Sequence, residues 1–109
     1  MTEIKIIKKQ GKILGFECAG HAGFAPSGQD VVCAAISTLV GSCHLGIAKV
    51  LGLPHTYKID EEAGFFALNI TPQIAQNEGA QIVLETFVQS VQDLANTNQK
   101  FIKLKIIGG

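Results

Sequence analysis

His21 and Cys33 are the two residues of this 109-residue chain whose types could together support nucleophilic catalysis. A histidine beside a thiol accepts its proton and stabilises the thiolate, which is the reactive form of cysteine. Cys33 follows His21 by twelve positions, at the start of a run that is typical of a helix. If Ser27 or Asp30 caps that helix, Cys33 lies in its first or second turn, where unpaired backbone N–H groups favour a negative charge. The alternative is that Cys33 is a small apolar residue of a helix core.

Asp30 and Ser37 lie three positions before and four positions after Cys33, which puts all three near one face of a helix. Asp30 could orient His21 or stabilise its charged form, and Ser37 could form a hydrogen bond in the site. Alternatively, Asp30 only caps the helix and Ser37 only bonds to the carbonyl one turn back. The spacing alone does not decide between these two sets of roles.

Residues 20–29 form a glycine-rich segment that is longer than a tight connection requires. Glycines on both sides of His21, Gly20 and Gly23, permit a close backbone approach or a positive φ. They could direct N–H groups at an oxyanion, or they could simply form turns. Long loops of this kind commonly carry function, so this segment is a candidate for substrate contact.

The spacing of the cysteines and histidines is poor for a zinc site. Cys18 and His21 are the only close pair of suitable ligands, whereas Cys43 and His44 are adjacent and point in different directions on a helix. We therefore expect no metal site, and core positions for Cys18 and Cys43. His44 looks structural, and the sequence identifies no partner for His55.

The elements that must position these residues follow from the apolar periodicity. Residues 3–9 and 12–18 predict a hairpin, in which Leu14, Phe16 and Cys18 share one face. The further expected elements are a long helix over 30–52, strands over 55–60 and 64–71, an amphipathic helix over 78–95 and a strand over 101–107. The order β-β-α-β-β-α-β predicts an α/β fold of the α+β type, with two helices on one face of a small mixed sheet.

The composition predicts one domain, residues 1–109, with an apolar helix that the chain cannot cover alone. Hydrophobic residues make up 47% of the chain and charged residues only 17%. Residues 31–48 contain no charged side chain and resemble a membrane span in length, but polar residues and glycines interrupt them. A helix that is apolar on nearly every face is normally buried all round, so we predict a homodimer rather than a membrane protein.

The charges exclude one class of partner and leave another open. The net charge is zero and no arginine is present, which argues against sequence-specific recognition of nucleic acids. Residues 13–99 carry a net charge of −6, which either steers a cationic peptide towards the chain or is an ordinary solvated surface. Three cysteines without a secretory segment predict reduced thiols in the cytoplasm.

The segments Gly20-His21-Ala22-Gly23 and Gly28-Gln29-Asp30-Val31-Val32-Cys33-Ala34-Ala35-Ile36-Ser37 resemble the signature of the bacterial ribosomal-processing cysteine proteases. The resemblance extends along the full chain. It implies that His21 is the general base and Cys33 the nucleophile, with Asp30 and Ser37 supporting the site. It also implies that the glycine-rich loop covers the substrate peptide, and the loop candidates are Gly20, Ala22, Gly23, Phe24 and Gly28.

The same resemblance implies a small homodimer that removes a short amino-terminal extension from large-subunit ribosomal protein number twenty-seven. Cleavage would follow a hydrophobic, phenylalanine-containing segment and would require neither a metal nor an organic cofactor. Two other classes of function stay open. A binding module would tolerate loss of the Cys33 thiol, and a redox sensor would oxidise Cys33 reversibly without cleaving a peptide.

Overall fold

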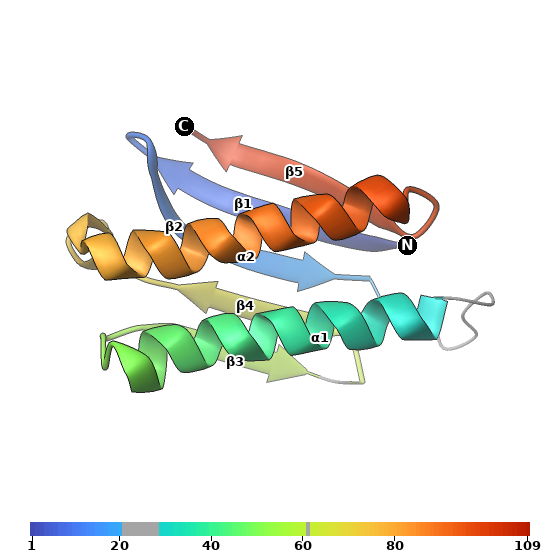
Figure 1. The fold of residues 1–109 in the computed structure, drawn as a ribbon, viewed down its shortest axis with the longest axis horizontal. Coiled ribbons are helices and arrows are strands. Elements are labelled where there is room, and N and C mark those ends of the chain that lie inside the picture. The colour runs from blue at the N-terminus through green and yellow to red at the C-terminus, as the bar shows by residue number, and fades with distance from the viewer. Residues whose placement is uncertain (21–28, 61) are drawn as a thin grey trace.

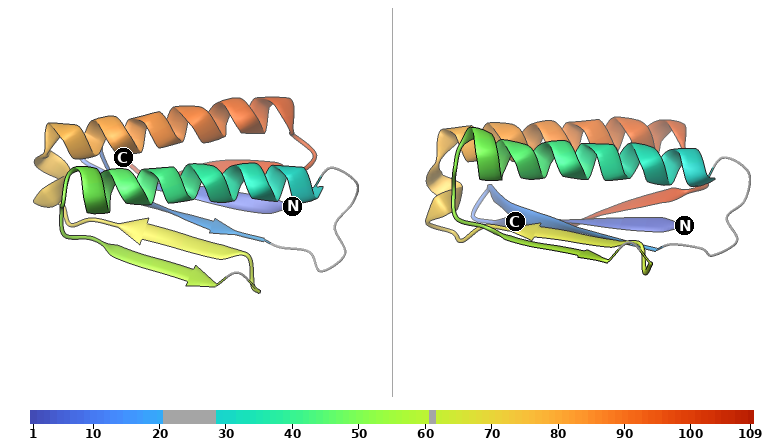
Figure 2. Two further views of the ribbon diagram at one scale, coloured as in Figure 1. Left: turned by 60° about the horizontal axis from the view of Figure 1, so that its bottom comes forward. Right: turned by 90° about the horizontal axis from the view of Figure 1, so that it is seen from below.

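The structure, a computed structural model, describes residues 1–20, 29–60 and 62–109, without the side chains of residues 29 and 30. Within these residues, five strands form one sheet and two long helices cover one of its faces (Figures 1 and 2). The elements are β1 (Thr2–Lys9), β2 (Lys12–Ala19), α1 (Gln29–Leu45), η1 (Gly46–Val50), β3 (Thr56–Asp60), β4 (Phe65–Asn69), η2 (Ile74–Gln76), α2 (Glu78–Thr97) and β5 (Ile102–Gly108). The predicted fold class and element order are confirmed. The π-helical turn η1 and the 3₁₀ turn η2 are additions that the periodicity did not predict.

The sheet has the strand order β3-β4-β2-β1-β5. All neighbouring pairs are antiparallel except β1 and β5, which are parallel. Helix α1 therefore connects the parallel strands β2 and β3, and α2 connects the parallel strands β4 and β5. The two crossovers start from antiparallel strands and run in opposite directions across the sheet. Right-handed connections consequently place both helices on the same face, as Figure 2 shows.

A β-bulge alters the face that the sequence predicts for β2. The pairing of β1 with β2 shifts register between Ile7 and Lys8, which leaves Leu14 as the extra residue of the bulged strand. Ile13 is therefore buried, whereas Leu14 is only half-buried. The predicted apolar face is wrong at Leu14 and confirmed at the two core positions that follow it, because the extra residue reverses the alternation.

Helix α2 is tightly joined to the strands beneath it. Its buried face consists of Ala80, Leu84, Phe87, Val91 and Ala95. The ring of Phe87 stacks on that of Phe16 in β2, with centroids 4.1 Å apart. The side-chain amide of Gln81 also accepts from the Ile13 N–H and donates to the Ile13 carbonyl, both at 2.9 Å. The predicted amphipathic helix is confirmed, and it continues two residues further than expected.

Helix α1 packs on the sheet along one face and leaves apolar side chains exposed on the other. Val31 in α1 is 74% exposed, and Val50 in the following turn η1 is 80% exposed. The segment Val31–Val50 is long and apolar enough to span a membrane by length and composition alone, and only 28% of it is buried. Core helices of globular proteins pass the same test. The expectation that this chain covers its apolar helix only in part is confirmed, and its cover by a second subunit stays a prediction.

Candidate active site

A cavity of about 420 Å³ lies between α1 and the strands beneath it. Cys33, Ser37 and Gly41 line it from α1, Tyr57 and Ile59 from β3, and Phe66 from β4. The three α1 residues are four positions apart and therefore share one helix face. Because their side chains are small, they leave space between the helix and the aromatic residues of the strands.

Cys33 is half-buried at the wall of this cavity. Helix α1 begins at Gln29, so Cys33 is its fifth residue and the first residue of its second turn, within the predicted limits. A helical Cα–Cβ bond tilts towards the helix amino terminus. The Cys33 side chain is thus directed towards the turn whose backbone N–H groups have no partner within the helix.

The structure places some of the predicted site residues and leaves others open. Ser37 is exposed and lines the same cavity as Cys33. The backbone of Asp30 belongs to the first turn of α1, but its side chain lies outside the described part of the molecule. Four predicted loop candidates and the predicted base also lie outside the described residues: His21, Ala22, Gly23, Phe24 and Gly28.

Gly20, directly before His21, is held at the edge of the cavity by the first residues of β1. The hydroxyl of Thr2 donates to the Gly20 carbonyl at 3.0 Å, and Thr2 is buried. Gly20 has a φ of +110°, and a side chain there would collide with the backbone of Met1. Only glycine fits this position. Thr2 and Gly20 therefore fix where the chain leaves β2, and sequence reasoning missed the contribution of Thr2.

The walls opposite α1 are apolar and aromatic. Tyr57 and Phe66 are half-buried, and Ile59 is 50% exposed. A concave site of this size and character suits an apolar or aromatic side chain of a ligand. Sequence reasoning did not assign these residues to the site. The available signal was the alternation of Tyr57 and Ile59, which places both on one face of β3.

Cys18 and Cys43 are buried thiols that differ chemically from Cys33. Burial raises the pKa of each to about 12, and the nearby Cys43 thiol adds to the shift at Cys18. Neither thiol supplies a thiolate near neutral pH. None of the three cysteines is in a disulfide. The predicted core positions of Cys18 and Cys43 are confirmed.

His44 and His55 lie together behind the aromatic wall. Their Nε2 atoms are 3.2 Å apart, and the His55 Nδ1 lies 2.9 Å from the Leu53 carbonyl oxygen. The His44 ring is parallel to that of Tyr57, with centroids 3.9 Å apart. Burial, His55 and Lys49 lower the pKa of His44. The sequence identified no partner for His55. The structure places His44 beside it, because the segment directly before β3 lies next to the end of α1.

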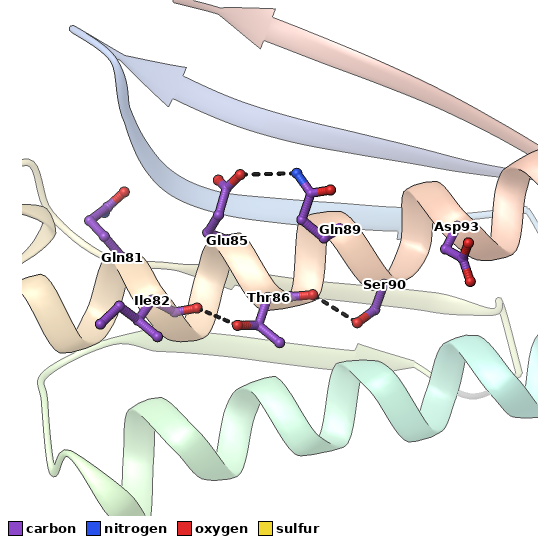
Figure 3. Close-up of a pocket in the computed structure, with 7 residues that line it drawn as sticks. All are labelled: Gln81, Ile82, Glu85, Thr86, Gln89, Ser90 and Asp93. Carbon is purple, nitrogen blue, oxygen red and sulfur yellow. Dashed lines mark hydrogen bonds between the residues drawn. The ribbon is translucent and has the colours of Figure 1, made fainter.

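Two other features of the described residues do not form a catalytic or metal site. Within residues 1–20, 29–60 and 62–109, no group of three histidine, cysteine or acidic residues is placed to bind a metal ion. A shallow depression on α2 (Figure 3) is formed by Gln81, Ile82, Glu85, Thr86, Gln89, Ser90 and Asp93. Gln81 bonds to Ile13 of β2, and the hydrogen bonds drawn in Figure 3 run along the helix itself, as between Gln89 and Glu85. It contains no thiol or imidazole that could act as a nucleophile or base.

Comparisons with known proteins identify the family and the fold of the chain. The family described as Cysteine protease Prp matches residues 1–103. The ribosomal processing cysteine protease Prp of Bacillus subtilis is 31% identical over 86 residues, which are 75% of each chain.

Two structures of the essential ribosomal processing protease Prp from S. aureus share the fold. The complex with a substrate peptide has a TM-score of 0.89 at 23% identity, and the complex with a covalently linked product peptide has a TM-score of 0.78 at 24% identity. In both, 97% of this chain and 99% of the other are covered.

Proposed function

The chain belongs to the Cysteine protease Prp family, and we propose that it removes the amino-terminal extension of large-subunit ribosomal protein number twenty-seven by Cys-His catalysis. The observation that carries the proposal is the position of the Cys33 thiol, which lies half-buried at the wall of an apolar cavity. The other two thiols are buried, each with a pKa raised to about 12, so Cys33 is the nucleophile that we assign.

The proposed reaction proceeds through a thioester. His21 accepts the Cys33 proton, and the sulfur attacks the scissile carbonyl carbon to form a tetrahedral oxyanion. The C–N bond then breaks, and the leaving amine takes the proton from His21. Water attacks the thioester, loses a proton to His21 and releases the new carboxylate as the C–S bond breaks and the Cys33 thiol is restored. A covalently linked product peptide in the S. aureus enzyme supports a covalent route of this kind.

The cavity is the site that we propose for a hydrophobic side chain of the substrate. Its volume of about 420 Å³ is within the range of small-ligand sites, and Tyr57 and Phe66 offer aromatic surfaces to a phenylalanine ring. Ser37, on the same wall as Cys33, is a candidate for a supporting hydrogen bond. The predicted role of Asp30 is orientation of His21. Gly20 fixes the start of the loop that we propose as a cover for the peptide.

We further propose that the enzyme is a cytoplasmic homodimer. Three apolar side chains of the α1 region, Val31, Leu45 and Val50, are at least half exposed. A second copy that covers them would remove this apolar surface from water. Sedimentation at micromolar concentration tests the proposal, and a monomer under these conditions would contradict it.

Peptide cleavage tests the assignment directly. The unsubstituted chain is incubated under reducing conditions with a peptide that spans the amino-terminal extension of the ribosomal protein, and the products are identified by mass spectrometry. We expect one cut after the phenylalanine-containing segment. Cys33→Ala and His21→Ala should each lower kcat/KM by at least ~10³-fold, because the two residues act as a unit.

Matched controls separate this function from its alternatives. Thermal unfolding of Cys33→Ala should resemble that of the unsubstituted chain, because Cys33 is only half-buried. A binding module would retain its function in Cys33→Ala, and a redox sensor would oxidise Cys33 without cutting the peptide. Absence of cleavage by the unsubstituted chain would refute the protease assignment.

A further inference from the structure

The aromatic wall of the cavity has a support outside the cavity itself. The His44 ring is stacked on Tyr57, with an interplanar angle of 8° and a centroid distance of 3.9 Å. Tyr57 in turn lines the same cavity as Cys33, on the wall opposite α1. His44 follows Gly41 by three positions, so it continues the helix face that carries Cys33 and Ser37. One face of α1 thus carries both the nucleophile and the residue that stacks on the opposite wall.

The hydrogen bonds of His55 determine how the two imidazoles pair. The Leu53 carbonyl can only accept, so the His55 Nδ1, 2.9 Å away, carries a hydrogen. In neutral His55 the Nε2 is then an acceptor, and the His44 Nε2–H donates to it across 3.2 Å. His44 is consequently held by His55 at one edge while its face contacts Tyr57.

The strand that carries Tyr57 is short and lies at the edge of the sheet. β3 is five residues long, lies at the edge of the sheet and pairs only with β4. Its residues are exposed except for Tyr57, which is half-buried. The stack of His44 on Tyr57 joins this edge strand to α1.

We propose that His44 and His55 position Tyr57 and thereby set how tightly the cavity holds an apolar side chain of the substrate. This inference rests on the proposed function for its substrate. His44 and His55 are positioning residues, because they act through Tyr57 and do not line the cavity. Loss of the pair lets the edge strand move and weakens binding of the peptide more than it slows bond cleavage.

Protonation disrupts the pair at one defined atom. A second proton on the His55 Nε2 faces the His44 Nε2–H, so the hydrogen bond between them is lost. The charged and titratable groups around His44 are Lys49 on η1, His55 before β3 and the Tyr57 hydroxyl. Lys49 and a charged His55 both oppose a charge on His44. Acid that forces a further proton onto the pair therefore weakens the position of Tyr57.

Intrinsic fluorescence tests the positioning without any substrate. Tyr57 is the only tyrosine and the chain has no tryptophan, so tyrosine emission reports on this ring alone. We expect the emission of the unsubstituted chain to change between about pH 8 and about pH 5, where imidazoles titrate. His44→Phe keeps an aromatic neighbour that does not titrate, and its emission should be constant. Ser42→Ala, an exposed position of α1, is the matched control and should titrate like the unsubstituted chain.

Peptide kinetics test the consequence for the substrate. His55→Ala should raise KM by about 5-fold, the equivalent of one hydrogen bond, while kcat changes less than ~2-fold. His55→Gln should restore KM, because its amide oxygen can accept from the His44 Nε2–H. The KM of the unsubstituted chain should rise in acid, and that of His44→Phe should not.

The outcomes keep the two proposals separate. Identical emission titrations in His44→Phe and the unsubstituted chain, or an unchanged KM in His55→Ala, overturn the positioning of Tyr57. If the unsubstituted chain cuts no peptide, the proposed function fails. The positioning is then decided by fluorescence: a titration that disappears in His44→Phe supports it, and one that persists refutes it.

Discussion

The two helices cover their halves of the sheet in opposite ways. Helix α2 closes its half with large side chains, and Phe87 stacks on Phe16 at 4.1 Å. Helix α1 presents small residues at Cys33, Ser37 and Gly41 and leaves a cavity of about 420 Å³ over β3 and β4. Both helices lie on the same face of one sheet (Figure 2). The difference in side-chain volume thus separates a stabilising half from a half with room for a ligand.

This comparison explains why the chain tolerates a helix that is so poorly covered. The α2 half supplies dense packing, which a domain of this size needs to offset the entropy of folding. The α1 half can then keep an open wall and exposed apolar residues. Stability and substrate binding are consequently expected to respond to different substitutions.

Labelling of thiols should give the largest contrast. At a pKa of about 12, Cys18 and Cys43 contain ~10³-fold less thiolate than a thiol at the ordinary value of 9.0. A small alkylating reagent should therefore modify Cys33 in the folded chain long before the other two, as peptide mass mapping would reveal. In denaturant all three should react together. Cys18 also lines the cavity, so its early labelling would mean that the cavity admits the reagent as far as β2.

Truncation of a buried side chain in the α2 half should lower the stability of the fold strongly. Phe87→Ala removes the ring that stacks on Phe16 and should lower the free energy of unfolding by ~3–5 kcal/mol. Urea unfolding followed by circular dichroism measures this change. Thr86→Ala, an exposed neighbour on the same helix, should change it by less than ~0.5 kcal/mol. Equal effects of the two substitutions would contradict the assignment of α2 as the stabilising half.

A larger side chain on the α1 wall of the cavity should instead weaken binding of the peptide. A Cβ at Gly41 meets no atom within 4 Å, so Gly41→Leu would extend into free space of the cavity wall. KM for the peptide should rise by at least ~10-fold, while removal of a helical glycine stabilises α1 by up to ~1 kcal/mol. Gly41→Ala adds only the Cβ and should have a smaller effect on KM. A leucine variant with unchanged KM would show that the cavity does not bind the substrate.

Acid should slightly destabilise the α1 half of the molecule, which contains His44. Burial, His55 and Lys49 lower the pKa of His44 below its ordinary value of 6.5, so the unfolded chain takes up a proton that the folded chain resists. The contribution of His44 to stability is present above about pH 6.5 and is lost as the pH falls towards the folded pKa. Melting temperatures measured over this interval should fall less in His44→Phe. A parallel fall in both proteins would assign the pH dependence to other groups.

Local patterns were sufficient to predict the elements and the candidate nucleophile. Alternation over residues 3–9 and the helical spacing over 78–95 predicted β1 and α2 within two residues. The bulge at Leu14 was missed, because an extra residue in one strand depends on its pairing with the other. Cys33 was found from its type and its distance from a helix start. The roles of His21, Asp30 and Ser37 stay predictions.

The sequence by itself determined the order of elements, the apolar helix and the family signature around Cys33, because each depends on residues that are close along the chain. Only the tertiary structure decided the strand order, the aromatic wall of Tyr57 and Phe66, and the pairing of His44 with His55. These features join segments that the crossovers through α1 and α2 bring together. Their residues belong to different elements and become neighbours only when the chain folds, so the apolar periodicity by itself did not join them.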